Sequence, residues 1–185
     1  MFNYLPETHL IKILIKEHDK IFSQINQLSV LSKNLSGLNN KNYEIILKRI
    51  NHLTIKLISI KSHHQREEDI FFPSMIKHGA SLPTTEMLKE HKLIRDLKFE
   101  LKQQTEHLYR YHPNTILKVQ KTANELCSVI CIHIHHEHTS IFPKALELIK
   151  DNREWKKMKV QSDKIGYALF KTKLNKPITD LMMVL

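Results

Sequence analysis

Apolar residues recur every three or four positions through four long stretches of the chain, which is the pattern of amphipathic helices. In the first stretch the apolar stripe consists of Ile11, Leu14, Ile21, Ile25 and Leu28. Turn signals separate the stretches. The expected helices cover about residues 6–35, 42–78, 84–111 and 114–150. Short connections between long helices place neighbours antiparallel, so the sequence predicts an all-α fold, an antiparallel up-down four-helix bundle over residues 6–150.

The remainder of the chain, residues 151–185, has a different character. Between Lys150 and Lys176 there are nine Lys or Arg and three Asp or Glu, which accounts for six of the net ten positive charges. A fifth helix is expected over residues 153–164, around Trp155. We interpret this region as a basic C-terminal appendage, helical and irregular, that docks on the bundle or on a protein partner.

Composition excludes several classes of protein. Three glycines in 185 residues argue against Gly-rich phosphate loops and a turn-rich β fold. Cys127 and Cys131 lie four apart in a helical pattern, which excludes a disulfide scaffold and suits a reducing compartment. No apolar stretch approaches 18 residues and the first ten residues carry no secretory signal, so a cytoplasmic protein without a membrane span is expected.

Histidine is the anomaly in the composition, with 13 residues, and the histidines belong to a duplicated pattern. Each copy has a lone His after Lys-Glu, and later a His-x-x-x-Glu motif followed by Phe-Pro. The two copies are Lys16-Glu17-His18 with His63-x-x-x-Glu67 and Phe72-Pro73, and Lys89-Glu90-His91 with His133-x-x-x-Glu137 and Phe142-Pro143. This self-similarity predicts two related helical hairpins. Packed about a pseudo-twofold axis, the hairpins would bring all four motifs to one level of the core.

Each His-x-x-x-Glu motif has the spacing of a metal-binding pair on a helix. Residues four apart lie about 40° apart around a helix and about 6 Å along it, so the imidazole and the carboxylate point to the same side. The alternatives are a satisfied core histidine for each lone His and a surface hydrogen bond for each His–Glu pair. The duplication favours metal binding, because a buried carboxylate is costly unless it is paired or bound to a metal.

Four helices together then supply the ligands of a two-metal site. The predicted ligands are His18, His63, Glu67, His91, His133 and Glu137. If each glutamate bridges two metals, each metal receives two histidine nitrogens, two carboxylate oxygens and a solvent oxo or hydroxo bridge, with one position open. Such mixed ligation is typical of two non-haem Fe ions, with Mn or Zn less favoured.

The order of these motifs resembles the hemerythrin-like family over about residues 10–148. The resemblance implies a di-iron centre in which the two glutamates bridge, with His18 and His63 on one iron and His91 and His133 on the other. Oxygen-carrying members place a second His one turn after the third-helix ligand, where this chain has Arg95. The motif His133-Ile134-His135-His136-Glu137 is also similar to that of iron–sulfur cluster repair di-iron proteins.

Other residues near the motifs are assigned from their angle around the helix. His64 and His136 lie at the border of the inward face, where either would complete the metal shell or form a hydrogen bond to it. The residues expected to face solvent are His135, His138, Glu17 and Glu90. Phe71, Phe72 and Phe142 are expected to wall the site and limit access to small molecules.

The leading functional hypothesis is a di-iron module that binds or senses a small oxidant such as dioxygen, nitric oxide or peroxide. The alternative is iron handling, with donation of iron to damaged iron–sulfur clusters under nitrosative or oxidative stress. Catalytic reduction of the oxidant is a third reading and requires an electron donor. The basic residues 151–185 favour an acidic protein partner or a solvated tail over nucleic acid, because no recognised nucleic-acid motif is present.

Overall fold

The computed structural model describes residues 2–35, 40–106 and 113–167, and the regular structure of these residues is helical throughout. The four long helices are α1 (Leu10–Lys33), α2 (Asn40–Ile58), α5 (Ser81–Glu106) and α6 (Pro113–His136). Shorter pieces continue two of them, namely α3 (Lys61–Arg66), a π-helical turn (Glu67–Phe71) and α4 (Phe72–Lys77) after α2, and a π-helical turn (Glu137–Ile141) and α7 (Phe142–Leu148) after α6. A final helix, α8, covers Asn152–Ile165. The predicted all-α class is therefore confirmed for the described residues.

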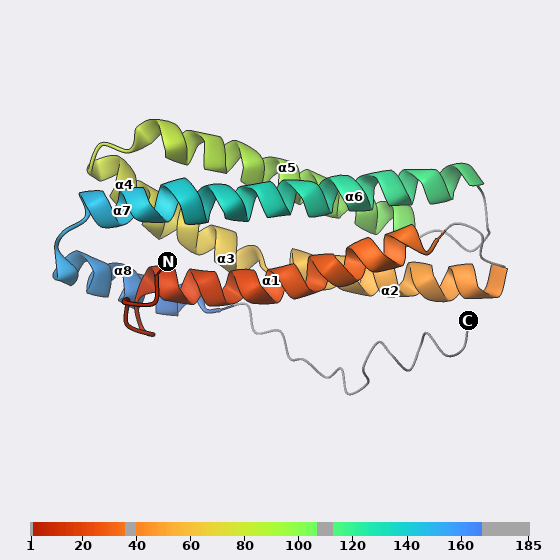
Figure 1. Ribbon diagram of the computed structural model, residues 1–185, viewed down its shortest axis with the longest axis horizontal. Helices are drawn as coiled ribbons and strands as arrows, with labels where there is room; N and C mark the ends of the chain where they lie inside the picture. The colour runs from red at the N-terminus through yellow and green to blue at the C-terminus, as the bar shows by residue number, and fades with distance from the viewer. Residues whose placement is uncertain (1, 36–39, 107–112, 168–185) are drawn as a thin grey trace.

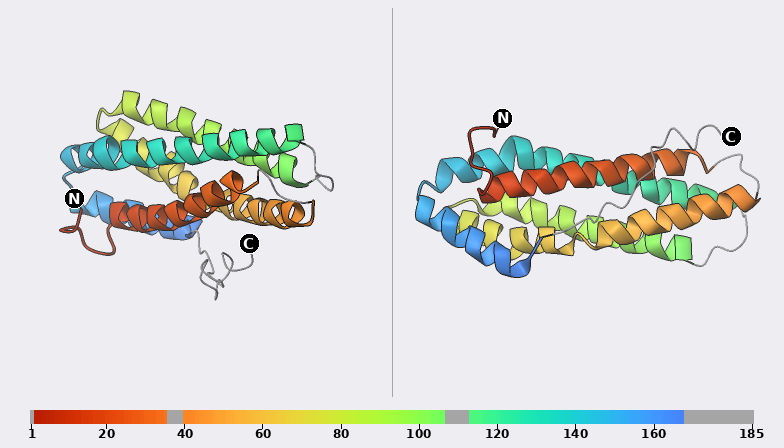
Figure 2. Two further views of the ribbon diagram at one scale, coloured as in Figure 1. Left: turned by 45° about the vertical axis from the view of Figure 1, so that its right-hand side comes forward. Right: turned by 90° about the horizontal axis from the view of Figure 1, so that it is seen from below.

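The four long helices lie side by side and contact one another in a ring (Figure 1). Helix α1 packs against α2, α2 against α5, α5 against α6, and α6 against α1. Figure 2 shows the same neighbours from two further sides, with α8 beside the N-terminal end of α1. Each helix thus presents one face to the interior, where residues from all four helices can meet.

The second and fourth helical segments are interrupted, whereas the apolar pattern predicted continuous helices there. The second segment has a turn at residues 59–60, between α2 and α3. Both segments also contain a π-helical turn that begins at the Glu of the repeated motif. A proline two residues after each turn explains it, because proline has no N–H and its ring clashes with the carbonyl four residues earlier. The chain avoids this clash by widening, so that the N–H of Phe72 donates to the carbonyl of Glu67, five residues back, and Phe142 does the same to Glu137.

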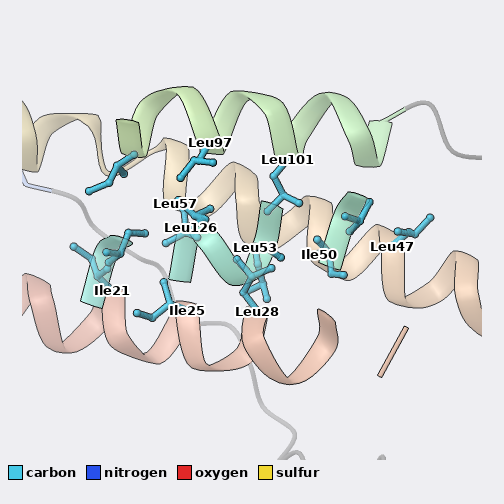
Figure 3. Close-up of a cluster of buried hydrophobic side chains, with 14 of the residues drawn as sticks. Ile21, Ile25, Leu28, Leu47, Ile50, Leu53, Leu57, Leu97, Leu101 and Leu126 are labelled. Atoms are coloured by element: carbon cyan, nitrogen blue, oxygen red, sulfur yellow. The ribbon is translucent and has the colours of Figure 1, made fainter. Parts of the chain in front are cut away.

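Two apolar clusters fill the interior, one on each side of the level of the histidines. The first joins α1, α2, α5 and α6, and Figure 3 shows its leucine and isoleucine side chains. The second contains the phenylalanines of the Phe-Pro motifs and Trp155 of α8. On α1, Leu14 belongs to the second cluster and Ile21 to the first, so His18 lies between the two. The histidine level is thereby enclosed by apolar residues above and below.

Helix α8 confirms the fifth helix expected over residues 153–164. Its first turn is capped by Asp151, whose carboxylate accepts the Arg153 N–H at 2.8 Å, and it ends at Gly166 with a φ of 83°. Trp155 is buried, and its indole N–H donates to the Ile149 carbonyl at 2.9 Å. The helix packs on α1, α3 and the first π-helical turn. Residues 168–185 of the predicted appendage lie outside the described residues.

No described helix combines the length and the apolar character needed to cross a membrane.

We expect Trp155→Ala to lower the free energy of unfolding by about 3 to 5 kcal/mol, because truncating a buried tryptophan leaves a cavity and an unpaired carbonyl. Val160→Ala on the same helix is the control, since Val160 is 57% exposed and its truncation should cost less than about 0.5 kcal/mol. Urea unfolding followed by circular dichroism measures both changes. Equal stability of the two variants would contradict the docked position of α8.

Candidate metal centre

The structure brings all six predicted ligands into one buried cluster at the centre of the ring of helices. Each long helical segment contributes one histidine, and each π-helical turn contributes its first residue, a glutamate. All six are at most 2% exposed. The cluster consists of His18, His63, Glu67, His91, His133 and Glu137. That these residues bind metal stays a prediction, but their convergence is what a shared site requires.

The histidines meet in two pairs through their Nε2 atoms. The Nε2 atoms of His18 and His63 are 3.0 Å apart, and those of His91 and His133 are 3.2 Å apart. These are the pairs that the family resemblance assigns to two separate irons. Nitrogens this close, on rings that meet nearly edge to face, point toward a common position between them.

Glu67 reaches both histidine pairs. Its Oε1 lies 3.2 Å from Nε2 of His63, and its Oε2 lies 3.3 Å from Nε2 of His91. One carboxylate oxygen therefore faces each pair, which is the position of a bridging ligand.

Glu137 closes the site from the other side. Its Oε2 is 3.0 Å from Nε2 of His18 and 3.6 Å from Nε2 of His133. This glutamate too lies between one histidine of each pair.

The surroundings of the two carboxylates show whether a cation would fit between them. None of the four oxygens of Glu67 and Glu137 has a hydrogen-bond partner within the described part of the chain, and all four are fully buried. The nearby histidine nitrogens approach within contact distance without hydrogen-bond geometry. Leaving a buried carboxylate without a hydrogen-bond partner costs at least about 1 to 3 kcal/mol. Buried oxygen and imidazole nitrogen atoms that converge without pairing fit one or two cations between them.

The pKa values of the buried side chains in the cluster are shifted by their burial and by one another. Burial and the neighbouring Glu67 carboxylate raise the pKa of Glu137 to about 8. Burial alone would lower the pKa of His63, but the carboxylates of Glu67 and Glu17 raise it to about 10. Burial, together with the charge of His63, lowers the pKa of His18 to about 3. The two carboxylates thus raise the affinity of this level for positive charge, which a bound cation would also supply.

Three of the four histidines are held from outside by a carboxylate at Nδ1. The partner is Glu17 for His63 at 2.8 Å, Glu68 for His91 at 2.8 Å and Glu90 for His133 at 2.9 Å. An ionised carboxylate only accepts hydrogen bonds, so Nδ1 of each histidine carries the proton. The lone pair of the neutral ring then lies on Nε2, which faces the centre. Carboxylates in this position fix the orientation of metal-binding histidines and raise their basicity.

The expectation that Glu17, Glu90 and His138 face solvent was wrong. Glu17 is only 4% exposed, and His138 supplies the ring nitrogen that lies 2.8 Å from Nδ1 of His18. The angle around a residue's own helix suggested solvent, but each of these side chains reaches a histidine on a neighbouring helix. The repeat itself was the signal that could have identified these contacts, because it predicts two hairpins whose helices pack against each other. His135, by contrast, is exposed as predicted.

The outer contacts follow the duplication. Arg66 and His136, each one residue before a repeated glutamate, occupy equivalent positions. Arg66 donates to Glu17, and Nδ1 of His136 lies 2.8 Å from Glu90. His136 therefore acts as a hydrogen-bond partner around the site, one of the two roles considered for it. The pseudo-twofold relation seen in the sequence extends to this outer layer.

Phenylalanines wall the site as predicted. Phe142 stacks on the His18 ring at 5.9 Å, and Phe72 stacks on the His91 ring at 5.7 Å. Phe71 packs edge to face against Phe142. All three are at most 1% exposed, so this side of the histidine level is dry.

His64 departs from the symmetry of the site. Its ring stacks on His91 with 3.9 Å between centroids, and one of its nitrogens joins Glu67, His91 and His133 in a group of donor atoms within 4.8 Å of one another. Burial lowers the pKa of His64 well below its usual range, which leaves the ring neutral. Arg95 stands one turn after His91 and pairs with Glu68 instead of facing the site. A third imidazole therefore does approach this pair, and it comes from α3.

Comparison with known proteins adds a family and a set of relatives. The hemerythrin HHE cation binding domain matches residues 9–145. Curated relatives include the iron-sulfur cluster repair protein YtfE of Yersinia pestis (strain Pestoides F) and that of Yersinia pseudotuberculosis serotype IB (strain PB1/+). Each is 28% identical over 148 residues, which is 76% of this chain. The aligned region spans 66% of the length of each relative.

We expect Glu90→Ala to weaken metal binding about 10- to 100-fold, because His133 would lose the carboxylate that orients it. Glu86→Ala is the matched control, since Glu86 lies one turn earlier on α5 and pairs with Lys89 at the surface. Competition with a metal chelator, monitored for both variants, measures the change. Identical affinities for the two variants would contradict a role of the outer carboxylates in metal binding.

Proposed function

This chain belongs to the hemerythrin HHE cation-binding family, and on that premise we propose that it is a non-haem di-iron protein that binds or senses a small oxidant. The observation that carries the proposal is the pair of fully buried carboxylates, Glu67 and Glu137, whose oxygens lack hydrogen-bond partners among the described residues. Four Nε2 atoms surround them at 3.0 to 3.6 Å. Two iron ions satisfy both sets of atoms, with Mn or Zn as less favoured occupants.

The proposal takes the four long helical segments as one antiparallel up-down four-helix bundle with α8 as its appendage. Bundles of this kind hold carboxylate-bridged metal pairs in their cores. His18 and His63 would hold one iron and His91 and His133 the other, and Glu67 and Glu137 would supply carboxylate oxygens between them. The fit of the helix contacts to this architecture supports the proposal, since each helix delivers its ligand to one level.

When bound, ferrous iron supplies a coordination position and electrons for dioxygen, nitric oxide or peroxide. The chain's own residues set the conditions. The carboxylates at Nδ1 keep the histidines oriented, and the phenylalanines keep water away from one side of the rings. A site walled by apolar side chains in this way favours the binding or sensing of small molecules. Catalytic reduction of the oxidant would further require an electron donor.

Iron handling is the second candidate, and a specific observation favours it. The relatives that match this chain are named as iron–sulfur cluster repair proteins. Under this hypothesis the site holds iron and donates it to damaged clusters under nitrosative or oxidative stress. A cytoplasmic location would suit either function, and Cys127 and Cys131 are both free in the structure. Contact of the basic appendage with a protein partner stays a prediction.

We expect His63→Ala and Glu67→Ala each to remove at least one metal per chain, because each deletes a donor group of the buried cluster. His135→Ala is the control, since His135 is exposed on the helix that carries His133. Elemental analysis of the purified variants gives the metal content. Full metal content in His63→Ala would contradict the assignment, and a single zinc in the unaltered protein would contradict a di-iron site.

The two candidate functions separate in one set of measurements. Protein loaded anaerobically with ferrous iron is exposed to dioxygen or nitric oxide and its absorption spectrum is recorded. The oxidant hypothesis expects a spectral change that Glu67→Ala abolishes. The repair hypothesis expects, in addition, transfer of iron to an apo iron–sulfur protein. Loaded protein that responds to neither gas and transfers no iron would contradict both.

A further inference from the structure

The two halves of the site are built from equivalent residues but differ in their contact with solvent. Glu17 and Glu90 occupy equivalent positions, yet their side chains are 5% and 22% exposed. The contrast is larger for their partners, since the side chain of Arg66 is fully buried and that of His136 is 45% exposed. The support of His63 is therefore shielded from solvent, whereas the support of His133 is partly exposed.

Helix α8 causes the difference, because it covers only one half. Arg66 donates to the carbonyl of Gly166 at the end of α8, and its guanidinium lies 4.7 Å from the centre of the Tyr167 ring. The same guanidinium donates to Glu17, which holds His63. The exposure of His136 indicates that no described element covers the equivalent place in the other half.

A pocket opens onto the half that α8 leaves uncovered. Its volume is about 520 Å³, and it lies between the second helical segment and α5. Glu68, the partner of His91, lines this pocket together with Gln65, Asp69 and His64. Lys61, Arg95 and Lys98 line it as well, and Arg95 pairs with Glu68. The four side chains named first offer oxygen and nitrogen atoms suited to a ferrous ion. At the positions equivalent to His64 and Arg95, the other half has the apolar Ile134 and Phe22.

His64 stands between this pocket and the metal-binding atoms. It lines the pocket and also a small internal cavity of about 10 Å³ that His63 and His133 line. Its ring is 93% buried against the His91 ring, and no described residue forms a hydrogen bond with it. One of its nitrogens belongs to the donor group with Glu67, His91 and His133. An imidazole nitrogen in this place can bind a metal without first breaking a hydrogen bond to a described residue.

We propose that the metal held by His91 and His133 is the exchangeable one of the two, and that it enters and leaves through His64 into the pocket in front of it. This inference rests on the proposed function, in which the site holds two metal ions. The ferrous ion that is exchanged is the one bound by His91 and His133. The position held by His18 and His63 is the retained one, sealed by Arg66 and the end of α8.

Release proceeds by ligand exchange and involves no redox step. The His64 nitrogen binds the ferrous ion as His91 or His133 lets go, so the ion does not pass through an unligated state. Gln65 and the carboxylates of Glu68 and Asp69 then offer oxygen ligands on the way to solvent. The ion keeps its charge and oxidation state, and protons from solvent replace it on the vacated side chains.

Chelator capture of iron from the full chain tests the proposal. Protein loaded anaerobically with two ferrous ions is mixed with excess ferrozine, and release is followed by absorbance. We expect two phases of one iron each, separated at least tenfold in rate. His133→Ala should leave only the slow phase, and His63→Ala only the fast phase.

Substitutions that keep all six ligands test the roles of His64 and Arg66. His64→Leu preserves the buried volume but removes the nitrogen, so the fast phase should slow about tenfold while the slow phase stays unchanged. His135→Leu, at an exposed histidine, should change neither phase. Arg66→Met should accelerate the slow phase alone, because it releases Glu17. Circular dichroism checks that each variant is folded.

The outcomes distinguish this proposal from the function on which it rests. Two irons that leave at one rate, or a fast phase that persists in His133→Ala, would overturn the unequal positions and leave the di-iron assignment intact. A fast phase unaffected by His64→Leu would overturn the exit route. A chain that never holds two metals would overturn the proposed function and this inference with it.

Discussion

Two carboxylates buried in the middle of a helical protein are the constraint on which the rest of the structure depends. Removing Glu67 and Glu137 from water is expensive, and no described backbone or hydroxyl donor satisfies them. The histidines of four different segments must therefore reach them at one level, and a positive charge must be present, as protons or as metal. Apolar clusters on both sides of that level keep it dry, which strengthens every electrostatic interaction inside it.

Two copies of one helical hairpin satisfy this constraint, because each copy supplies the same kinds of residue to the site. Some supporting contacts stay within one hairpin, as between Glu17 and His63 or between Glu90 and His133. Others cross between hairpins, where the residue after the glutamate of each His-x-x-x-Glu motif contacts the lone histidine of the other copy. These two kinds of contact tie all four helices to the site. Loss of one outer partner therefore disturbs the geometry of a histidine without removing it.

The ligand positions could be predicted from sequence because residues four apart on one helix share a face wherever that helix packs. The fifth helix around Trp155 could be predicted for a similar reason. The outer partners Glu17 and His138 could not, since each contacts a histidine on another helix and single-helix periodicity contains no information about neighbours. The π-helical turns add a second reason, because the extra residue in each turn changes the direction of the side chains that follow Glu67 and Glu137. The proline of each Phe-Pro motif is the local signal for that change.

The places where the two copies differ suggest how one site can hold two unequal metals. The six inner positions are identical in kind between the halves, so the inner layer alone gives two equivalent metals. The layer around them does diverge, as His64 against Ile134 and Arg66 against His136. Helix α8, which the duplication does not supply, adds a seal on the Arg66 side only. Retention on one side and exchange on the other thus require no change in the ligands themselves, because the surroundings set how readily each metal leaves.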